Sequence, residues 1–355
     1  MPAQPSGPLT VAVVGATGAV GRTMLQVLIE RAFPFAALRP LASARSAGSS
    51  LAIAGRRLDV QEATAAAFDG VDIALFSAGA SASGTLAPLA VEAGAVVIDN
   101  SSRWRMEPGV PLVVPEVNAQ DAATHEGLIA NPNCSTMQLV PLLAALRDAA
   151  GLERVVVDTY QAVSGSGHKA VAELQAQVEA HVAGQPVRAT VYPHAIAFNV
   201  LPQVDVFLDD GYTREEWKVI HESRKILHLP ELRLSCTAVR VPVFTGHSEA
   251  VHVELREPLS PTLAREAFAA VPGVVVVDEP AASRYPLATD AAGRDEIYVG
   301  RVRQDVSIPD GRGLAFWVVS DNLRKGAATN AVQIAELVAA RGWLTPASRR
   351  AGRAA

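Results

Sequence analysis

The sequence predicts an α/β protein with two domains: a parallel sheet with helices on both faces, then an α+β domain whose sheet is mostly antiparallel. In the first 133 residues, short apolar runs alternate with helical patterns, which is typical of a parallel sheet. After residue 133 the apolar runs are longer and fewer helical patterns separate them, which favours antiparallel pairing. The length of 355 residues also suggests two domains, at roughly 150 residues each.

The first domain begins with a strand at 9–14, a glycine-spaced turn at 15–21 and a helix at 20–31, whose apolar residues recur with a helical period. Further strands are predicted at 38–42, 72–76 and 96–98, with a helix at 85–93. In the second domain the pattern predicts helices at 134–149, 168–183, 214–227 and 261–270, and strands at 154–163, 232–243, 250–255, 297–306 and 314–319. A last helix is predicted at 326–340.

Composition excludes several classes of protein. Hydrophobic residues make up 49% of the chain and charged residues 19%, which supplies a core and excludes a disordered chain. The net charge is −5 and no basic block occurs, so we expect no nucleic-acid partner. The only cysteines, Cys134 and Cys236, exclude a disulfide framework and fit a reducing compartment.

Neither a membrane segment nor an export signal is expected. Apolar runs such as 155–157 and 274–277 have the length of strands, far below the ~20 residues of a transmembrane helix. Residues 1–8 are rich in Pro, Gly and Ser and lack Lys and Arg, so we expect a loose tail there and another at 348–355. The expected location is the cytoplasm.

The turn after the first strand is spaced for a nucleotide. Gly15, Gly18 and Gly21 permit a tight turn and a close approach of backbone N–H groups to a pyrophosphate, and the N-terminus of the following helix adds positive partial charge. This pattern predicts a Rossmann-type domain. The spacing is GxxGxxG instead of GxGxxG, and a glycine-rich turn without a ligand is the alternative interpretation.

The end of the second strand predicts which nucleotide binds. NAD-preferring sites usually have Asp or Glu there, on the ribose hydroxyls. In this chain the segment SARS at 43–46 follows instead, with no acid, and Arg45 is suited to a 2′-phosphate. We therefore predict NADP, the alternative being that Arg45 is an exposed loop residue. A second contact is expected at 76–79, a strand end with small residues.

Cys134 is the candidate nucleophile. Asn133 is a suitable N-cap for the helix that follows, which puts Cys134 in the first turn, where the helix dipole lowers the pKa of a thiol. The alternative is a small buried cysteine. Cys236 lies in the middle of a predicted strand, and core packing is the favoured interpretation there.

Taken together, ten segments of the chain occur in the order found in one known family. They are GATGAVG (15–21), LASARSAG (41–48), IDNSSRWRM (98–106), PLVVPEVN (111–118), NPNCST (131–136), YQAVSGSG (160–167), IAFNVLPQVD (196–205), GYTREEWKVIHESRKIL (211–227), RVPVFTGHSE (240–249) and SDNLRKGAATNAVQIAE (320–336). With these segments the chain resembles the aspartate-semialdehyde dehydrogenases, in the branch typical of many bacteria.

The resemblance implies a reversible, NADPH-dependent reductive dephosphorylation of L-4-aspartyl phosphate to L-aspartate 4-semialdehyde. This reaction serves the synthesis of lysine through diaminopimelate, and of threonine, methionine and isoleucine. Cys134 matches the nucleophile that forms a thioester. Asn133, or backbone N–H groups at the helix start, are expected to stabilise the oxyanion. His247 matches the acid/base residue, and Gln161 matches the residue that orients the substrate.

Other matches concern the charged ends of the substrate. Arg240 matches the carboxylate binder, because a guanidinium holds a carboxylate with two parallel hydrogen bonds. Glu215 matches the acid that faces the amino group, and Lys218 and Arg105 match the phosphate binders. From the residues alone, Glu215 and Lys218 read as a helical ion pair. Arg103 departs from the family pattern, so which of the two arginines meets the phosphate stays open.

The cofactor is expected to contact both domains. Ser164 and Gly165 resemble the loop beside the nicotinamide, and Asn322 resembles the residue that binds the carboxamide. The full set of expected cofactor residues is Gly15, Thr17, Gly18, Ala19, Val20, Arg45, Ser46, Ser77, Ala78, Gly79, Ser164, Gly165 and Asn322. No metal is implied.

The expected domain division is an NADP-binding domain at 1–133, completed by the helix in 322–345, and a catalytic and dimerisation domain at 134–321. The family forms dimers through the catalytic sheet, so a homodimer is expected. The alternatives are an N-acetyl-γ-glutamyl-phosphate reductase, which shares the fold and the chemistry, and a non-catalytic relative. The segments 240–243 and 211–227 favour the aspartyl enzyme, and the presence of Cys134 and His247 argues against a non-catalytic relative.

Overall fold

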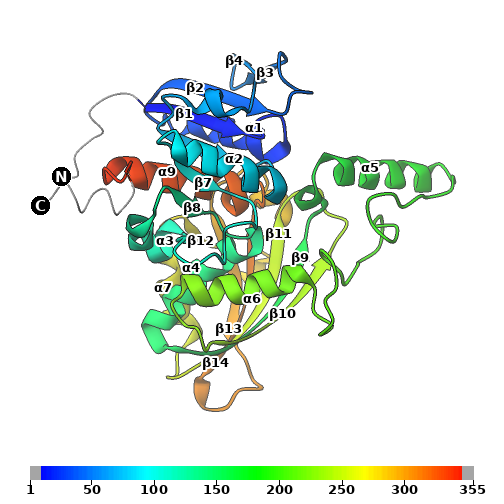
Figure 1. Cartoon of the computed structure of the whole chain (residues 1–355). Helices are drawn as coiled ribbons and strands as arrows, with labels where there is room; N and C mark the ends of the chain where they lie inside the picture. The colour runs from blue at the N-terminus through cyan, green and yellow to red at the C-terminus, as the bar shows by residue number, and fades with distance from the viewer. Residues whose placement is uncertain (1–8, 346–355) are drawn as a thin grey trace, which may run out of the picture. The chain divides into compact units, whose positions relative to one another are not determined.

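The computed structural model describes residues 9–345 (Figure 1). The described residues form two compact units, one of residues 9–133 and 327–345 and the other of residues 134–326. The chain therefore crosses between them twice, after Asn133 and after Gly326. The tails expected at 1–8 and 348–355 lie outside the described residues.

The first unit is built on a parallel six-stranded sheet of order β5-β2-β1-β6-β7-β8. Its elements are β1 (Leu9–Val14), α1 (Ala19–Glu30), β2 (Phe35–Ala42), β3 (Ser50–Ile53), β4 (Arg56–Asp59), β5 (Gln61–Glu62), η1 (Ala65–Phe68), β6 (Ile73–Phe76), α2 (Ala80–Glu92), β7 (Val96–Asp99), α3 (Pro115–Asn118), η2 (Ala119–Thr124), β8 (Leu128–Ala130) and, late in the chain, α9 (Asn330–Ala340).

Helices cover both faces of this sheet because successive side chains of a buried parallel strand point to opposite faces. On β1, Val11 and Val13 belong to one core cluster with α1 and α9, whereas Ala12 and Val14 belong to another with α2. The helix α9 thus completes the first unit from the far end of the sequence (Figure 1).

The structure adds elements that the sequence did not predict. The hairpin β3–β4 and the short strands β5 and β8 are absent from the predicted pattern, since two- to four-residue strands carry too little alternation to be recognised. Helix α2 begins at Ala80, earlier than the predicted start at residue 85, because Gly79 ends the preceding turn with a positive φ of 80° and the small residues after it are helical.

The second unit carries a mixed, mostly antiparallel sheet of order β10-β9-β11-β14-β13-β12, in which β9–β10 and β12–β13 are the parallel pairs. Its elements are α4 (Cys134–Ala150), β9 (Leu152–Gln161), η3 (Val163–Ser166), α5 (His168–Val182), α6 (Arg214–Ile226), β10 (Arg233–Arg240), β11 (His247–Leu255), α7 (Pro261–Ala269), β12 (Val274–Val276), η4 (Pro280–Ala282), α8 (Ala288–Ala291), β13 (Ile297–Gln304), η5 (Pro309–Gly311) and β14 (Gly313–Ser320). The helical turn η6 (Arg324–Thr329) contains the point at which the chain returns to the first unit. The two-part fold class predicted from the sequence is confirmed.

Strand register brings polar residues together at one end of this sheet. Gln161 ends β9 and is paired with Arg240, which ends β10. His247 begins the antiparallel strand β11, so it lies at the same end. Strand β11 starts earlier than the predicted residue 250, because its polar first residues do not show an apolar alternation. Helices α4, α6 and α7 pack on one face of the sheet, which we call the inner face (Figure 1).

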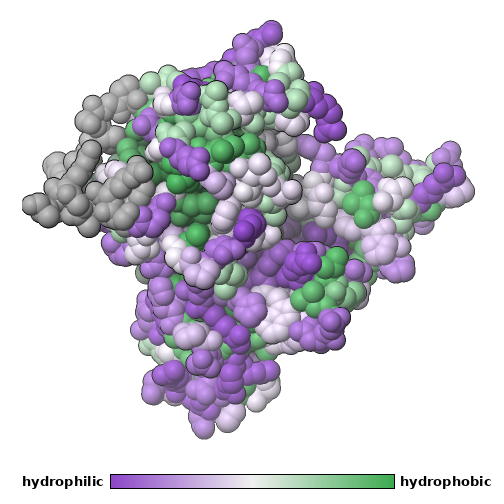
Figure 2. All heavy atoms as spheres, viewed as in Figure 1, coloured by the Kyte–Doolittle hydropathy of each residue, from purple (hydrophilic) through white to green (hydrophobic). Residues whose placement is uncertain are grey.

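Figure 2 shows a largely hydrophilic surface over the lower part of the molecule, with a small hydrophobic group close to helix α6. Three exposed apolar side chains stand in a row shortly before this helix in the chain: Val206, Phe207 and Leu208. Within residues 9–345, no helix is both long enough and apolar enough to cross a membrane.

Candidate functional site

The two cysteines have opposite environments. Cys134 is the first residue of α4 and is partly exposed, at the helix N-terminus, where the helix dipole favours negative charge. Cys236 is buried in β10, and burial raises the pKa of its thiol well above the usual value, with Glu249 and Glu216 adding to the effect. A thiolate is the reactive form of cysteine, so Cys134 is the better nucleophile.

Gln161 ties the end of the sheet to the start of α4. Its Nε2 donates to Ser135 Oγ at 3.0 Å and to Glu215 Oε1 at 3.3 Å. Ser135 follows Cys134 directly, so this side chain fixes the distance between the strand end and the first turn of the helix. Gln161 is 1% exposed, and its position is set by both bonds.

His247 is fully buried and held in one tautomer. Its Nδ1 accepts the backbone N–H of Ala162 at 3.0 Å. An amide N–H only donates, so Nδ1 carries the lone pair and the proton of the neutral ring lies on Nε2. Burial and, to a lesser degree, the nearby Arg240 lower the pKa of His247 to about 3. Nε2 has no hydrogen-bond partner among the described residues.

Arg240 is a buried cation without a counter-ion. Its side chain is 5% exposed, and its Nη1 donates to the carbonyl of Ala162 at 2.7 Å. No carboxylate pairs with it anywhere in residues 9–345, and its Nε has no partner there. A buried guanidinium in this state is a strong binding group for an anion.

Lys218 differs from Arg240 because two carboxylates balance its charge. Its Nζ lies 3.0 Å from Glu215 Oε2 and 2.8 Å from Asp205 Oδ2. Desolvation lowers the pKa of Lys218, but the two carboxylates outweigh it, so the net shift is upward. Helix α6 holds these residues through a capping box, in which Thr213 and Glu216 bond each other's backbone N–H groups.

Two glycines leave space around the reactive side chains. A Cβ at Gly165 would lie 3.3 Å from the imidazole Nε2 of His247 and 3.3 Å from Nη1 of Arg240. Likewise, a Cβ at Gly326 would lie 3.1 Å from Cβ of Cys134. Gly326 was not predicted as a site residue. Its signal in the sequence was a lone glycine in an otherwise helical, Ala-rich stretch.

In the first unit, the structure separates the two candidate arginines. Arg105 is buried, and it donates from Nε to the carbonyl of Asn131 at 3.0 Å and from Nη2 to that of Asn100 at 2.8 Å. Arg103 is exposed, pairs with Glu107 and lies over the ring of the adjacent tryptophan. Only Arg105 is therefore joined to the segment that leads to Cys134.

Asn131, which the sequence did not single out, organises that segment. Its Nδ2 donates to Asn100 Oδ1 at 2.8 Å and to the carbonyl of Ala327 at 2.9 Å, and its Oδ1 accepts from Asn330 Nδ2 at 2.7 Å. Asn133 is 5% exposed. Helix α4 begins at the residue after it.

The glycine turn of the first unit has the shape that a pyrophosphate needs. Gly15 has φ +83°, and a Cβ there would lie 2.6 Å from the carbonyl oxygen of Ser77. A Cβ at Gly21 would lie 2.2 Å from the carbonyl oxygen of Gly15, so helix α1 approaches the strand as closely as backbone allows. No side chain caps α1, which leaves its N-terminal N–H groups for an anion.

The predicted cofactor residues fall into two sets. The first set lies at the carboxyl edge of β1, β2 and β6, where the N–H of Gly15 bonds the carbonyl of Leu41. It comprises Gly15, Thr17, Gly18, Ala19, Val20, Arg45, Ser46, Ser77, Ala78 and Gly79. Arg45 is exposed and makes no hydrogen bond or ion pair with any described residue.

The second set belongs to the other unit. Asn322 donates from Nδ2 to Ser164 Oγ at 2.9 Å and accepts the N–H of Gly246 on Oδ1 at 2.9 Å. It therefore joins the end of β14 to the loops that carry Gly165 and His247.

Comparison with known proteins agrees with this geometry. Residues 10–125 match the family "Semialdehyde dehydrogenase, NAD binding domain" and residues 143–325 match "Semialdehyde dehydrogenase, dimerisation domain". An aspartate-semialdehyde dehydrogenase of Aquifex aeolicus is 53% identical over 338 residues, covering 94% of this chain and 99% of that protein. The Bacillus subtilis protein of the same name is 50% identical over 92% of this chain and 96% of its own length.

This chain belongs to the aspartate-semialdehyde dehydrogenase family. The solved structure of aspartate semialdehyde dehydrogenase II from Vibrio cholerae, complexed with ASA, is similar to it with a TM-score of 0.90 and 46% identity, over 94% of this chain and 98% of that one. The family resemblance, the enzyme class and the nucleotide-binding fold predicted from the sequence are confirmed.

Proposed function

We propose that the chain reduces L-4-aspartyl phosphate to L-aspartate 4-semialdehyde with release of phosphate, through a thioester on Cys134. The observation that carries this proposal is the buried Arg240, which has no counter-ion and lies beside His247 at the end of the inner sheet face. A free carboxylate on the substrate supplies the missing negative charge. The bond between Gln161 and Ser135 sets this anchor at a fixed place relative to Cys134.

In the first step the Cys134 sulfur attacks the acyl carbon, and the carbon–oxygen bond to phosphate breaks. The helix N-terminus stabilises the thiolate before attack and, with Asn133, the oxyanion that forms. NADPH, held by the glycine turn at 15–21 and by Arg45, would supply the hydride that reduces the thioester carbon. The resulting hemithioacetal releases the aldehyde when its carbon–sulfur bond breaks and the sulfur leaves as thiolate.

His247 presents an N–H group to this chemistry. Because Nδ1 is occupied by the Ala162 amide, Nε2–H acts first as a hydrogen-bond donor to the oxygen on which charge develops. Full proton exchange at Nε2 requires Nδ1 to release that amide and take a proton. The ring therefore serves as the acid/base group only through a small movement against Ala162.

The remaining polar side chains match the other ends of the substrate. Glu215, which is buried and bonded to Gln161, is suited to the amino group. Lys218 lies beside Glu215 and, with Arg105 of the first unit, is assigned to the phosphate. Since Lys218 already has two carboxylate partners, we expect Arg105 to contribute more of the phosphate affinity.

NADP is the proposed cofactor, because the free Arg45 follows β2 and no acid stands in the segment 43–46. The glycine turn fits a dinucleotide, since a Cβ at either Gly15 or Gly21 would collide with backbone. The match of residues 10–125 to an NAD-binding domain does not distinguish NAD from NADP, so the proposal of NADP depends on Arg45.

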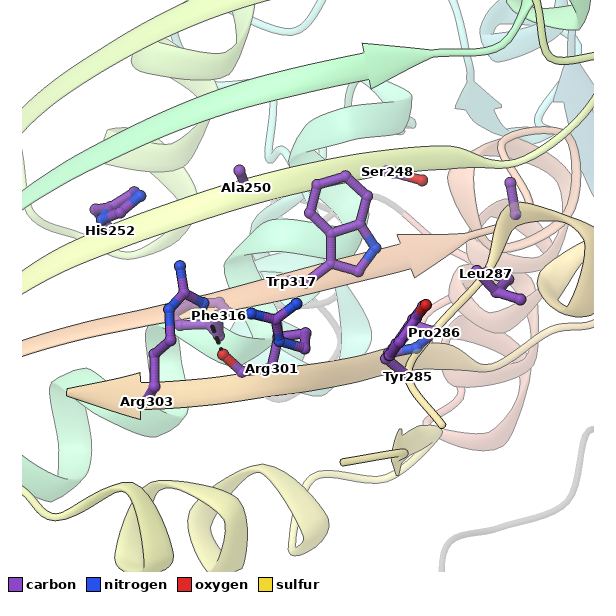
Figure 3. A pocket seen from close by; sticks show the side chains of 11 residues that line it. Ser248, Ala250, His252, Tyr285, Pro286, Leu287, Arg301, Arg303, Phe316 and Trp317 are labelled. Carbon is purple, nitrogen blue, oxygen red and sulfur yellow. Dashed lines mark hydrogen bonds between the residues drawn. The ribbon is translucent and has the colours of Figure 1, made fainter. Parts of the chain in front are cut away.

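Two copies of the chain are proposed to pack through the sheet face that the helices leave open, which we call the outer face. A hollow of about 420 Å³ on this face is lined by side chains of β11, β13 and β14. They include Trp317, Arg301 and His252, which are labelled in Figure 3. The rings of Trp317 and Tyr160 lie 5.3 Å apart. The match of residues 143–325 to a dimerisation domain supports this assignment.

The reaction is tested in the direction of NADP reduction, with L-aspartate 4-semialdehyde and with or without phosphate. We expect phosphate-dependent NADPH formation by the native chain and by Cys236→Ser, and none by Cys134→Ser. Equal turnover of Cys134→Ser would contradict the nucleophile. Absence of turnover by the folded, NADP-binding native chain, together with turnover of N-acetylglutamate semialdehyde, would favour the related reductase.

A further inference from the structure

The segment 185–201, which we call the α5 loop, follows helix α5 and contains no helix and no strand (Figure 1). The reaction proposed above does not use it. Its last residue is nevertheless joined to Arg240: the N–H of Leu201 donates to the carbonyl of Arg240 at 2.9 Å, and the N–H of Arg240 donates to the carbonyl of Leu201 at 2.8 Å. The loop therefore ends beside the residue to which we assign the substrate carboxylate.

A buried carboxylate of α5 holds the middle of this loop. Glu173 is 7% exposed, and its Oε2 accepts the N–H of Thr190 at 2.7 Å, the N–H of Val191 at 2.6 Å and the hydroxyl of Thr190. Burial raises the pKa of Glu173, but these bonds outweigh it and the net shift is downward. Glu173 is therefore ionised at neutral pH, which strengthens its bonds to the loop.

Gln177, one turn further along α5, holds the loop on both sides of this point. It is 2% exposed, and its Oε1 accepts the N–H groups of Ile196 and Ala197, each at 2.9 Å. Its Nε2 donates to the carbonyl of Arg188 at 2.8 Å. Because the side chains of Glu173 and Gln177 satisfy backbone groups along the loop, an irregular segment is kept in one conformation.

Tyr192 lies between the loop residues that these two side chains bind. Its ring packs on a buried apolar cluster of Val163, Ala170, Leu174, Ile196 and Leu201. The Cζ atom of Arg240 lies over the ring, 5.8 Å from the ring centroid. A cation at this distance from an aromatic face is attracted to it, and the attraction is larger when the cation is buried, as Arg240 is. The hydroxyl of Tyr192 has no hydrogen-bond partner among residues 9–345, so its contact with Arg240 is made by the ring.

Arg240 needs such a contact because its own hydrogen bonds leave much of the side chain free. Nη1 donates to the carbonyl of Ala162, whereas Nε has no partner in the described part of the chain. A guanidinium binds a carboxylate with two parallel hydrogen bonds only when its plane has the right orientation. A ring placed against the guanidinium limits its movement before the substrate arrives.

We propose that Tyr192 is a positioning residue for Arg240, and that Glu173 and Gln177 place it there by holding the α5 loop. The proposal rests on the function proposed above, in which Arg240 binds the substrate carboxylate. Tyr192 acts through Arg240 and not on the reacting atoms. Since the carboxylate is bound in the same way before and during the reaction, loss of the ring is expected to change KM and not kcat.

The test compares Tyr192→Leu, which removes the ring, with Tyr192→Phe, which keeps it. The matched control is Phe198→Leu, because Phe198 is on the same loop but is 67% exposed and its ring lies against His181. Two aldehydes are used: L-aspartate 4-semialdehyde, and 3-aminopropanal, which is the same molecule without its carboxylate. For each, kcat and KM are measured with NADP and phosphate in excess.

Tyr192→Leu is expected to raise the KM for the semialdehyde about tenfold, with kcat within about threefold. Its kcat/KM for 3-aminopropanal stays within about twofold of the native value, because that aldehyde has no carboxylate for Arg240 to bind. Tyr192→Phe and the control keep the native constants. General damage to the fold would lower the activity on both aldehydes alike, so the two substrates separate positioning of Arg240 from a merely structural role.

The role of the α5 loop is tested separately with Gln177→Met, which keeps the length of the side chain and removes its hydrogen bonds. Arg188 is the only Lys or Arg between Lys169 and Arg214, so tryptic cleavage after Arg188 reports on the loop without any turnover. We expect cleavage about threefold faster or more, together with a raised KM for the semialdehyde. The matched control is Gln175→Met, since Gln175 is exposed on the same helix and bonds Glu179.

An unchanged KM in folded Tyr192→Leu overturns the proposal, and so does an equal loss with both aldehydes or a Tyr192→Phe variant that behaves like Tyr192→Leu. If Tyr192→Leu does not fold, a native KM in Gln177→Met despite faster cleavage overturns it instead. Failure of the proposed function is recognised differently, because the native chain then does not turn over the semialdehyde. Calorimetric titration with L-aspartate is the test in that case, and Tyr192→Leu must still raise its Kd about tenfold.

Discussion

At the scale of single residues, Arg240 and Lys218 are two cations that differ in whether a carboxylate balances their charge. Both are largely removed from solvent, but Lys218 has two carboxylate partners and Arg240 has none. A buried charge without a partner is costly to the free protein. Binding an anion removes this cost, so we expect the affinity for the substrate carboxylate to be concentrated at Arg240.

Gly165 makes a prediction at this scale, because a methyl group there would press on the His247 ring and the Arg240 guanidinium at 3.3 Å. We expect Gly165→Ala to lower kcat/KM about tenfold, which corresponds to about 1.4 kcal/mol, by displacing both groups slightly. Gly84→Ala is the control, since its added Cβ would lie 3.8 Å from Arg103 in ordinary contact. The measurement is steady-state kinetics. Full activity of Gly165→Ala would show that a methyl group at this position does not displace His247 or Arg240.

Arg45 makes the second residue-scale prediction. Loss of a charged hydrogen bond to a 2′-phosphate costs about 1.5–3 kcal/mol, so Arg45→Ala should raise the KM for NADP by about tenfold or more and leave that for NAD unchanged. The control is Arg57→Ala, which removes another exposed arginine of the first unit, one paired with Asp59. If Arg45→Ala changes the KM for NADP and the KM for NAD equally, Arg45 is an exposed loop residue that does not bind the 2′-phosphate.

At the scale of elements, local patterns predicted some features and long-range pairing decided others. The helix that begins at Cys134 and the glycine turn are local, so the sequence shows them directly. The strand-end residues Gln161, Arg240 and His247 meet only through register, which a single sequence does not encode locally, and they were identified through resemblance.

The same limit explains which site residues were missed. Asn131 acts through contacts with residues far along the chain, such as Asn330. Nothing in its immediate sequence neighbours marks it as a polar group of a buried network. Burial and three-dimensional neighbours, which only the fold supplies, give it its place in that network.

Helix α1 and strand β1 carry the prediction at this scale. Because a Cβ at Gly21 would lie 2.2 Å from the Gly15 carbonyl oxygen, Gly21→Ala must push the helix away from the strand. We expect a loss of about 1–3 kcal/mol in the free energy of unfolding of the first unit and at least tenfold weaker NADP binding. Urea denaturation and fluorescence titration measure the two effects. Native affinity in Gly21→Ala would show that the close packing is not needed.

At the scale of the whole molecule, two fully buried groups contribute to the pH dependence of stability in opposite directions. Glu249, with its pKa raised to about 8, stabilises the fold fully below its ordinary value of 4.5, and this contribution is lost as the pH rises toward 8. His247, with its pKa lowered to about 3, stabilises the fold above its ordinary value of 6.5, and this contribution is lost as the pH falls toward 3. The two slopes cancel between pH 4.5 and 6.5.

Glu249→Gln should therefore gain stability relative to the native chain as the pH rises from 4.5 to 8, by up to about 1.4 kcal/mol per pH unit. The native chain loses stability between pH 6.5 and 8, whereas the variant does not. Urea unfolding at pH 5, 6.5 and 8, followed through the transition of the second unit, measures the difference. If the free energies of unfolding of the variant and the native chain differ by the same amount at all three pH values, Glu249 is ionised throughout this range.

The outer face of the sheet makes the last prediction, because it concerns the assembly of complete chains. Side chains of this face include Tyr160, which is 36% exposed, and Trp317, and both are large aromatic groups of the kind enriched at interfaces. A glutamate at position 317 would put a charge in the centre of the contact, where it has no partner, at a cost of several kcal/mol.

We expect light scattering to give twice the chain mass for the native protein and the chain mass for Trp317→Glu. Leu263→Glu, on the exposed side of α7, keeps the dimer, since Leu263 is 52% exposed but lies on the helix-covered side of the sheet. If both variants remain dimeric, the chains associate through another surface, and the open sheet face then needs a different explanation.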